Sequence, residues 1–130
     1  MTTNPSFGSQ METTVEKDLD LKAYLLSKDE PYALLVPVRE YENPADNTLY
    51  DYSKLCAKFG WHKLDQIHVE NTEHLVLFDA DQRAQKGKGS FWVNGKQYQG
   101  CGILLRGHDR GSPLGCNLSM AEVMEISKPR

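Results

Sequence analysis

The sequence predicts an α+β domain in which about two helices pack on one face of a small, mainly antiparallel sheet. Three observations lead to this class. Apolar and polar residues alternate between positions 19 and 25, an Asn94-Gly95 pair separates two strand-like segments, and Ser119 opens a short amphipathic helix. Because strand signals outnumber helix signals and follow one another closely, neighbouring strands are expected to pair antiparallel.

The first half of the chain contains two strand signals. The alternation over residues 19–25 favours a half-buried strand over the competing helix, which would use Leu21, Tyr24 and Leu25. Residues 32–38 (YALLVPV) form a continuous apolar run, as in a strand inside a sheet. Pro37 has no N–H to donate, so it is expected at a sheet edge or near the end of the strand.

A helix is predicted over residues 48–59, with Asn47 as its N-cap and Gly60 at the position where a glycine ends a helix. Residues 61–70 are ambiguous, with Ile67 and Val69 as the possible start of a short strand. Residues 74–80 (HLVLFDA) contain an apolar run and indicate a buried strand.

The strongest local signal is a hairpin over residues 91–98. Asn-Gly supplies the two positive φ angles of a type I′ turn, which joins strands through a two-residue loop. The resulting register places three residues of each strand opposite one another: Val93 with Lys96, Trp92 with Gln97, and Phe91 with Tyr98. A further strand is predicted over residues 100–107 (GCGILLRG), and a glycine-rich loop follows it up to residue 117.

The last predicted element is a short helix that begins after Ser119. Ser119 and Glu122 have the spacing of a capping box, and Leu118 and Val123 have the spacing of a hydrophobic staple. Pro129 would end the helix because it cannot continue the hydrogen-bond pattern.

The chain has 130 residues, 25% of them charged, and a formal net charge of −3. This size fits one domain, expected over residues 13–130, after a flexible tail over residues 1–12 with little apolar surface. Such a charge predicts no bulk attraction to nucleic acid or membrane, and no apolar run approaches the roughly 18 residues of a membrane span. Three widely spaced cysteines and the lack of a secretory signal predict a reduced, cytoplasmic protein.

Between Gln82 and His108 the sequence contains no Asp or Glu, although the chain has 18 of them. Basic side chains can hold phosphates, an exposed aromatic ring can stack on a base, and Gly87 and Gly89 let the backbone approach an anion closely. The candidate ligand-binding residues are Arg83, Lys86, Lys88, Ser90, Trp92, Lys96 and Arg106.

Two other interpretations of this segment stay open. It can be a solvated hairpin whose aromatic residues face the core, or a surface that binds an acidic protein. The alternation of the hairpin bears on the choice: if Phe91 and Val93 are buried, Trp92 faces outward and is available to a ligand.

Other chemistries find less support in the sequence. Cys101 or Cys116 could act as a nucleophile, but buried structural cysteines are the common case. Asp79 and Asp81 could form a carboxylate pair, although aspartate is also frequent where a strand enters a turn. No C-x-x-C or H-x-x-x-H pair is present to suggest zinc. The sequence therefore predicts no catalytic residue, no metal and no cofactor.

The C-terminal half resembles small uncharacterised proteins carried by phages and other mobile elements. The resemblance lies in the strand ending in Asp79-Ala80-Asp81, in residues 91–98 (FWVNGKQY) and 100–105 (GCGILL), and in the capped terminal helix. It implies an accessory, non-catalytic role, such as binding a host factor or a signalling nucleotide.

We therefore expect a non-catalytic binding protein, of a phage-type accessory or counter-defence kind, that binds its ligand through residues 82–108. The expected partner is an anionic small molecule, a nucleic acid or an acidic protein surface, and not a membrane. A protein-partner inhibitor or adaptor is the alternative. A small cysteine-dependent enzyme using Cys101 or Cys116 is a further one.

Overall fold

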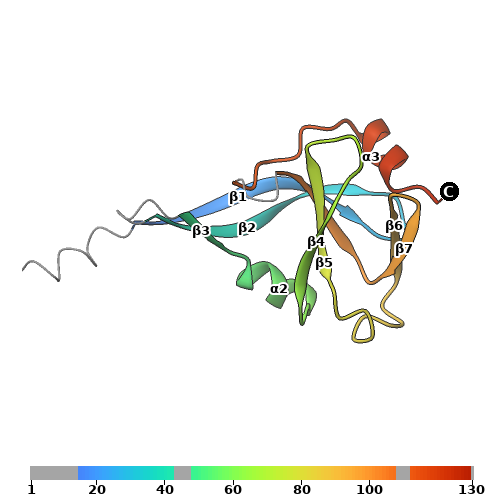
Figure 1. The fold of residues 1–130 in the computed structure, drawn as a ribbon, viewed down its shortest axis with the longest axis horizontal. Helices are drawn as coiled ribbons and strands as arrows, with labels where there is room; N and C mark the ends of the chain where they lie inside the picture. The colour runs from blue at the N-terminus through green and yellow to red at the C-terminus, as the bar shows by residue number, and fades with distance from the viewer. Residues whose placement is uncertain (1–14, 43–47, 108–111, 130) are drawn as a thin grey trace, which may run out of the picture.

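The computed structural model describes residues 15–42, 48–107 and 112–129, which form eight strands and two helices (Figure 1). In chain order these are β1 (Val15–Leu26), β2 (Tyr32–Glu42), β3 (Thr48–Asp51), α2 (Ser53–Phe59), β4 (Leu64–His68), β5 (His74–Asp79), β6 (Ser90–Val93), β7 (Lys96–Gln99), β8 (Gly102–Arg106) and α3 (Met120–Ile126). The tail expected over residues 1–12 lies outside the described residues.

Six strands form one antiparallel sheet in the order β3-β2-β1-β8-β5-β4, and β6 and β7 form a separate hairpin. The predicted α+β class with a mainly antiparallel sheet is therefore confirmed. The strands predicted over residues 19–25 and 32–38 lie within β1 and β2, and the ambiguous residues 61–70 contain β4. Pro37 lies where β2 pairs only with β1, because β3 reaches only residues 39–42.

The central strands β5 and β8 are buried on both faces of the sheet. Neighbouring residues of β5 belong to different core clusters: Leu75 packs with Leu55 of α2, and Val76 packs with Val123 of α3 and with the hairpin. The two helices thus cover opposite faces, whereas the sequence suggested that they share one. The physical reason is that successive apolar residues of a strand point to opposite faces, so the run Leu75–Phe78 needs cover on both sides of the sheet.

The outer halves of β1 and β2 extend from the body together with β3 as a three-stranded arm (Figure 1). We define the arm as residues 15–22, 36–42 and 48–51. Most of its side chains are exposed or half-buried. Its six acidic and three basic residues give it a net charge of −3.

The helix predicted over residues 48–59 begins later than expected. Its first part is β3, because pairing with β2 satisfies the backbone groups there and overrides the helical spacing of the side chains. Asn47, the expected N-cap, lies outside the described residues, and Tyr52 takes this place without a side-chain hydrogen bond. The end is as predicted: Gly60 has a φ of 66° and its N–H donates to the carbonyl of Cys56.

The predicted hairpin is confirmed in both its turn and its register. Asn94 and Gly95 have φ angles of 54° and 75°, as a type I′ turn requires. The three cross-strand pairs are those that the sequence predicts: Val93 with Lys96, Trp92 with Gln97, and Phe91 with Tyr98. The side chains of Phe91 and Val93 are fully buried, so this face of the hairpin points into the core.

The capping box of α3 is also confirmed. The Ser119 hydroxyl accepts a hydrogen bond from the backbone N–H of Glu122 at 3.2 Å, and the Glu122 carboxylate accepts one from the N–H of Ser119 at 3.0 Å. Leu118 and Val123 belong to the same core cluster, which is the arrangement that a hydrophobic staple requires.

We expect Ser119→Ala to lower the free energy of unfolding by about 1 kcal/mol, because one helix N–H loses its acceptor. Urea unfolding followed by circular dichroism measures this change. Ser127→Ala at the other end of α3 is the matched control, since Ser127 makes its cap contact through its backbone N–H. Equal urea midpoints for the two variants would contradict the cap.

Candidate functional site

A buried carboxylate organises the end of the molecule where β5 stops. Asp79 is 1% exposed and accepts hydrogen bonds from the backbone N–H groups of His62 (3.0 Å), Lys63 (2.9 Å) and Asp81 (2.9 Å), and from Nε2 of Gln85 (2.8 Å). Burial by itself would raise the pKa of Asp79, but these hydrogen bonds outweigh burial and hold the pKa below its usual value. Asp79 is therefore an ionised structural group.

This carboxylate holds two chain segments side by side, residues 60–63 after α2 and the loop over residues 80–89. Gln85 reinforces the contact, because its Nε2 also lies 3.3 Å from the carbonyl oxygen of Gly60. Lys63 is far from the loop in the sequence, but these contacts place it next to the loop in the fold. No pattern in the sequence predicts that residues 60–63 lie against the loop, since this depends on which strands pair.

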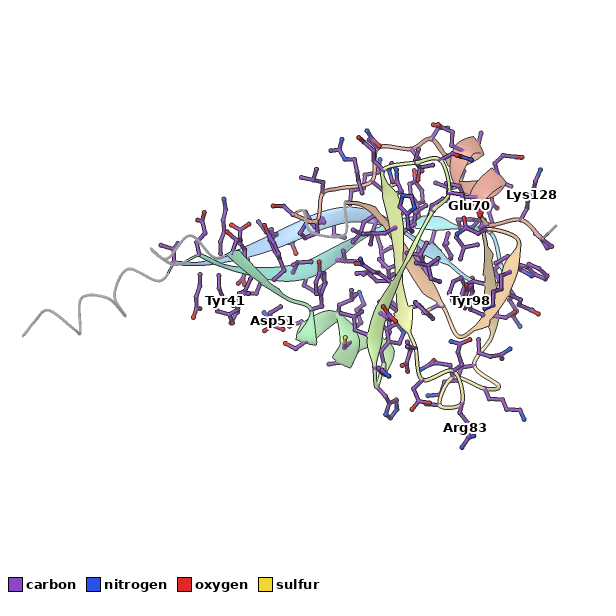
Figure 2. All side chains as sticks on the ribbon, in the orientation of Figure 1. Tyr41, Asp51, Glu70, Arg83, Tyr98 and Lys128 are labelled. Carbon is purple, nitrogen blue, oxygen red and sulfur yellow. The ribbon has the colours of Figure 1, made fainter. Side chains whose placement is uncertain are left out.

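The exposed cationic residues of the two segments form a surface that we call the basic end: Lys63, Arg83, Lys86 and Lys88. Arg83 extends away from the body at the lower edge of Figure 2. None of the four forms an ion pair among the described residues. The acidic residues of residues 60–63 and 79–89 are Asp79 and Asp81, so four basic and two acidic side chains leave a net charge of +2.

Trp92 lies on the outward face of the hairpin that follows the loop. Ser90 is on the same face of β6, one alternation closer to the loop, and its Oγ accepts a hydrogen bond from Nε2 of Gln97 at 3.1 Å. The residues on either side of Trp92 are fully buried and fix the strand, whereas Trp92 itself is half-buried. One partly accessible aromatic side chain thus lies three residues after Gly89, on the strand that follows the loop.

Two residues predicted for the site are not brought to this surface. Lys96 follows the hairpin turn at the end remote from the loop, and its Nζ lies 5.2 Å from the ring centroid of Tyr98. Arg106 ends β8 opposite His74, the first residue of β5, so it lies at the other end of these strands from the loop. Of the remaining residues, Arg83, Lys86 and Lys88 lie on the loop and Ser90 and Trp92 on the strand that follows it, while Lys63 is held next to the loop through Asp79.

Arg106 is half-buried and instead lies opposite the buried His74 in the sheet. His74 is 4% exposed, and among the described residues neither of its ring nitrogens has a partner with hydrogen-bond geometry; Nε of Arg106 is likewise buried without one. Burial lowers the pKa of His74 and the charge of Arg106 lowers it further, which outweighs the opposite effects of the Asn117 side chain, Glu122 and Glu73. His74 is therefore neutral at pH 7.

We expect the free energy of unfolding to fall as the pH drops below about 6.5, because the unfolded chain then takes up a proton that buried His74 resists. His74→Gln should flatten this dependence between pH 7 and pH 5, which urea unfolding at the two pH values measures. His62→Gln is the control, since His62 is exposed. Identical pH dependences for both variants would show that His74 does not contribute.

The other sequence-derived candidates have structural explanations. Burial raises the pKa of Cys101 and Cys116, which is the opposite of what a reactive thiolate needs. The Asp79 oxygens are occupied by the bonds described above, and Oδ1 of Asp81 accepts from the N–H of Ala84 at 3.2 Å, as in a turn. Within the described residues, no group of three or more His, Cys, Asp and Glu could hold a metal ion.

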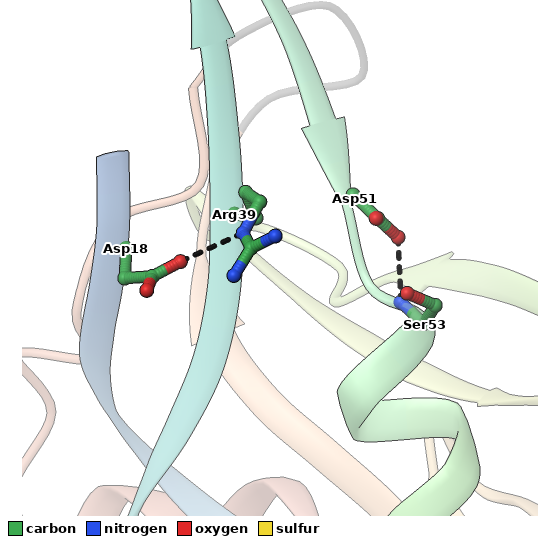
Figure 3. Close-up of polar contacts among 4 residues, drawn as sticks. All are labelled: Asp18, Arg39, Asp51 and Ser53. Atoms are coloured by element: carbon green, nitrogen blue, oxygen red, sulfur yellow. Dashed lines mark hydrogen bonds and ion pairs between the residues drawn. The ribbon is translucent and has the colours of Figure 1, made fainter. Parts of the chain in front are cut away.

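A pocket of about 270 Å³ lies where the arm meets the first turn of α2. Three of the charged side chains that line it are bonded to other groups of the protein (Figure 3). Nε of Arg39 donates to Asp18 at 2.8 Å, which lowers the pKa of Asp18, and Asp51 accepts from the N–H of Ser53 at 2.8 Å. These contacts tie the arm together and tie it to the first turn of α2.

Comparison with protein-family models, with curated proteins and with solved structures gives no match for this chain. The resemblance to small phage and mobile-element proteins therefore stays a prediction. No helix in the described part of the chain is long and apolar enough to cross a membrane.

Proposed function

We propose that this chain is a non-catalytic binding protein that takes up an anionic ligand on the basic end. The observation that carries the proposal is the convergence of Lys63, Arg83, Lys86 and Lys88 around buried Asp79. These side chains are exposed and form no ion pair among the described residues, so their charges are available to a ligand.

The distribution of charge over the molecule supports the same ligand class. The chain as a whole carries −3 and the arm alone carries −3, while residues 60–63 and 79–89, which contain the basic end, carry +2. An anion approaching this molecule is repelled by the arm and attracted to the opposite charge of the basic end. The charge pattern thus favours one orientation of binding, although the net charge of the protein is negative.

The alternative ligand is an acidic protein surface, which would bind to the same four cations. The cysteine-dependent enzyme gains no support, because burial raises the pKa of both thiols, whereas a reactive thiolate needs a lowered one.

The test is a titration of inorganic polyphosphate into the protein at low ionic strength by isothermal calorimetry. The variant carries Arg83→Glu, Lys86→Glu and Lys88→Glu. The control carries Lys17→Glu, Lys28→Glu and Lys54→Glu, which are exposed positions elsewhere and change the net charge equally. We expect the first variant to lose affinity by about tenfold or more, and the control to lose much less.

Two results would overturn the proposal. The wild-type protein could fail to bind polyphosphate, or the two triple variants could lose affinity equally, which would show an effect of net charge alone. Rising salt should weaken the binding of the wild type, since phosphate contacts release counterions.

A further inference from the structure

The half-buried Trp92, on the strand that follows the loop of the basic end, narrows the class of ligand. The four cations explain the attraction of any anion, whereas Ser90, Trp92 and Gln97 give the outward face of the hairpin an aromatic ring and hydrogen-bonding groups. Ser90 and Trp92 are two residues apart on one strand, which separates them by about 7 Å along its direction. A ligand that contacts both the loop and Trp92 must therefore reach at least this far.

We propose that the ligand of the basic end is single-stranded nucleic acid, with its phosphates on the loop cations and a base on Trp92. This inference rests on the proposed function. Proteins that bind single strands combine a basic surface that follows the backbone with aromatic side chains on which bases stack. The basic end and the hairpin supply these two parts in sequence, because Gly89 leads directly into β6.

The shape of the surface favours a polymer over a small nucleotide. Small ligands are bound in concave sites that enclose most of their surface. Arg83, Lys86 and Lys88 are exposed on a loop, and none of them lines the pocket in the arm. An exposed surface gains affinity by making several phosphate contacts at once, and a strand offers one phosphate for every nucleotide along its length.

The hairpin is a suitable platform because it does not have to become ordered on binding. Phe91 and Val93 are fully buried, Phe91 stacks on Tyr98 with 5.4 Å between ring centroids, and Phe78 contacts both rings. The strand that carries Trp92 is therefore fixed from its inner side. A base that stacks on this side chain does so without a large loss of conformational freedom.

The test measures the binding of four ligands at low salt by fluorescence anisotropy. Three are dye-labelled: oligo-dT and oligo-U of about 12 nucleotides, and a DNA duplex of the same length. The fourth, inorganic polyphosphate of similar charge, is measured as an unlabelled competitor. We expect both single strands to bind more tightly than the duplex and than polyphosphate. Their binding should quench tryptophan fluorescence, and Trp92→Phe should remove the quenching, since the other tryptophan, Trp61, is buried.

Trp92→Leu separates stacking from charge. We expect it to weaken the binding of the single strands by about tenfold and to leave the binding of polyphosphate unchanged, while Trp92→Phe retains most of the affinity. Tyr32→Leu, at an exposed tyrosine remote in the sequence, is the control. Circular dichroism and thermal unfolding establish that each variant is folded.

The possible outcomes separate this inference from the proposed function. If polyphosphate, duplex and single strands bind equally and Trp92→Leu changes none of them, the basic end binds anions but the nucleic-acid inference is wrong. If none of the four ligands binds, the proposed function is wrong as well. Stronger binding of the duplex than of the single strands would also overturn the inference.

Discussion

Gly102→Ala is expected to lower the free energy of unfolding by about 3 kcal/mol and the melting temperature by about 10 °C. A Cβ atom at this position would lie 2.6 Å from Cγ1 of Val76 and 2.9 Å from Cε2 of Phe91. Both side chains are fully buried, and Phe91 also packs against Phe78 and Tyr98, so neither can move aside cheaply. Thermal unfolding followed by circular dichroism measures the effect.

Gly107→Ala is the matched control, just beyond the other end of β8. A Cβ there would meet its nearest neighbour, Cδ2 of Leu75, at 3.5 Å, which is an ordinary contact distance. A melting temperature for Gly102→Ala as high as that for Gly107→Ala would show that β8 and the hairpin are not packed as closely as the structure has them.

Asp79→Asn is expected to destabilise the protein by about 3 kcal/mol at pH 7. In the wild type, Oδ1 accepts from the N–H groups of Lys63 and Asp81, and Oδ2 accepts from His62 N–H and Gln85 Nε2. The substitution turns one of these acceptors into a donor, so buried donors that face it are left unsatisfied. Asp20→Asn on the exposed arm is the control and should change the free energy of unfolding little.

The effect of Asp79→Asn should depend on pH in a defined direction. The pKa of Asp79 is lowered in the folded protein, so its stabilisation is complete above the unfolded value near 4 and is lost as the pH falls through the folded value. Urea unfolding at pH 7 and pH 3 should therefore show a smaller difference between wild type and variant at pH 3. A difference that does not depend on pH would contradict an ionised Asp79.

Asp79 also links the stability of the fold to the proposed function. Its carboxylate holds residues 60–63 against the loop that carries Arg83, Lys86 and Lys88. The acidic Asp79 thus holds together the two segments that carry the basic residues. Its own negative charge is buried and hydrogen-bonded to four donors, so the exposed side chains of the basic end present positive charge to the solvent.

The elements that the sequence predicted correctly are those that depend on residues a few positions apart. The Asn94-Gly95 turn fixes the register of the hairpin, because the φ angles that it requires are intrinsic to these residue types. The capping box at Ser119 and the end of α2 at Gly60 likewise depend only on residues within about one helical turn. The burial of Phe91 and Val93, with Trp92 outward, follows from strand alternation.

Only the tertiary structure decided which distant segments meet. The start of the helix predicted over residues 48–59 became β3, since pairing with β2 offered those backbone groups partners that side-chain spacing does not reveal. In the candidate site, the chain path separated Lys96 and Arg106 from the loop, and the hydrogen bonds of Asp79 added Lys63. A local pattern determines backbone conformation, whereas a binding surface depends on contacts between strands whose pairing is set by the packing of the whole core.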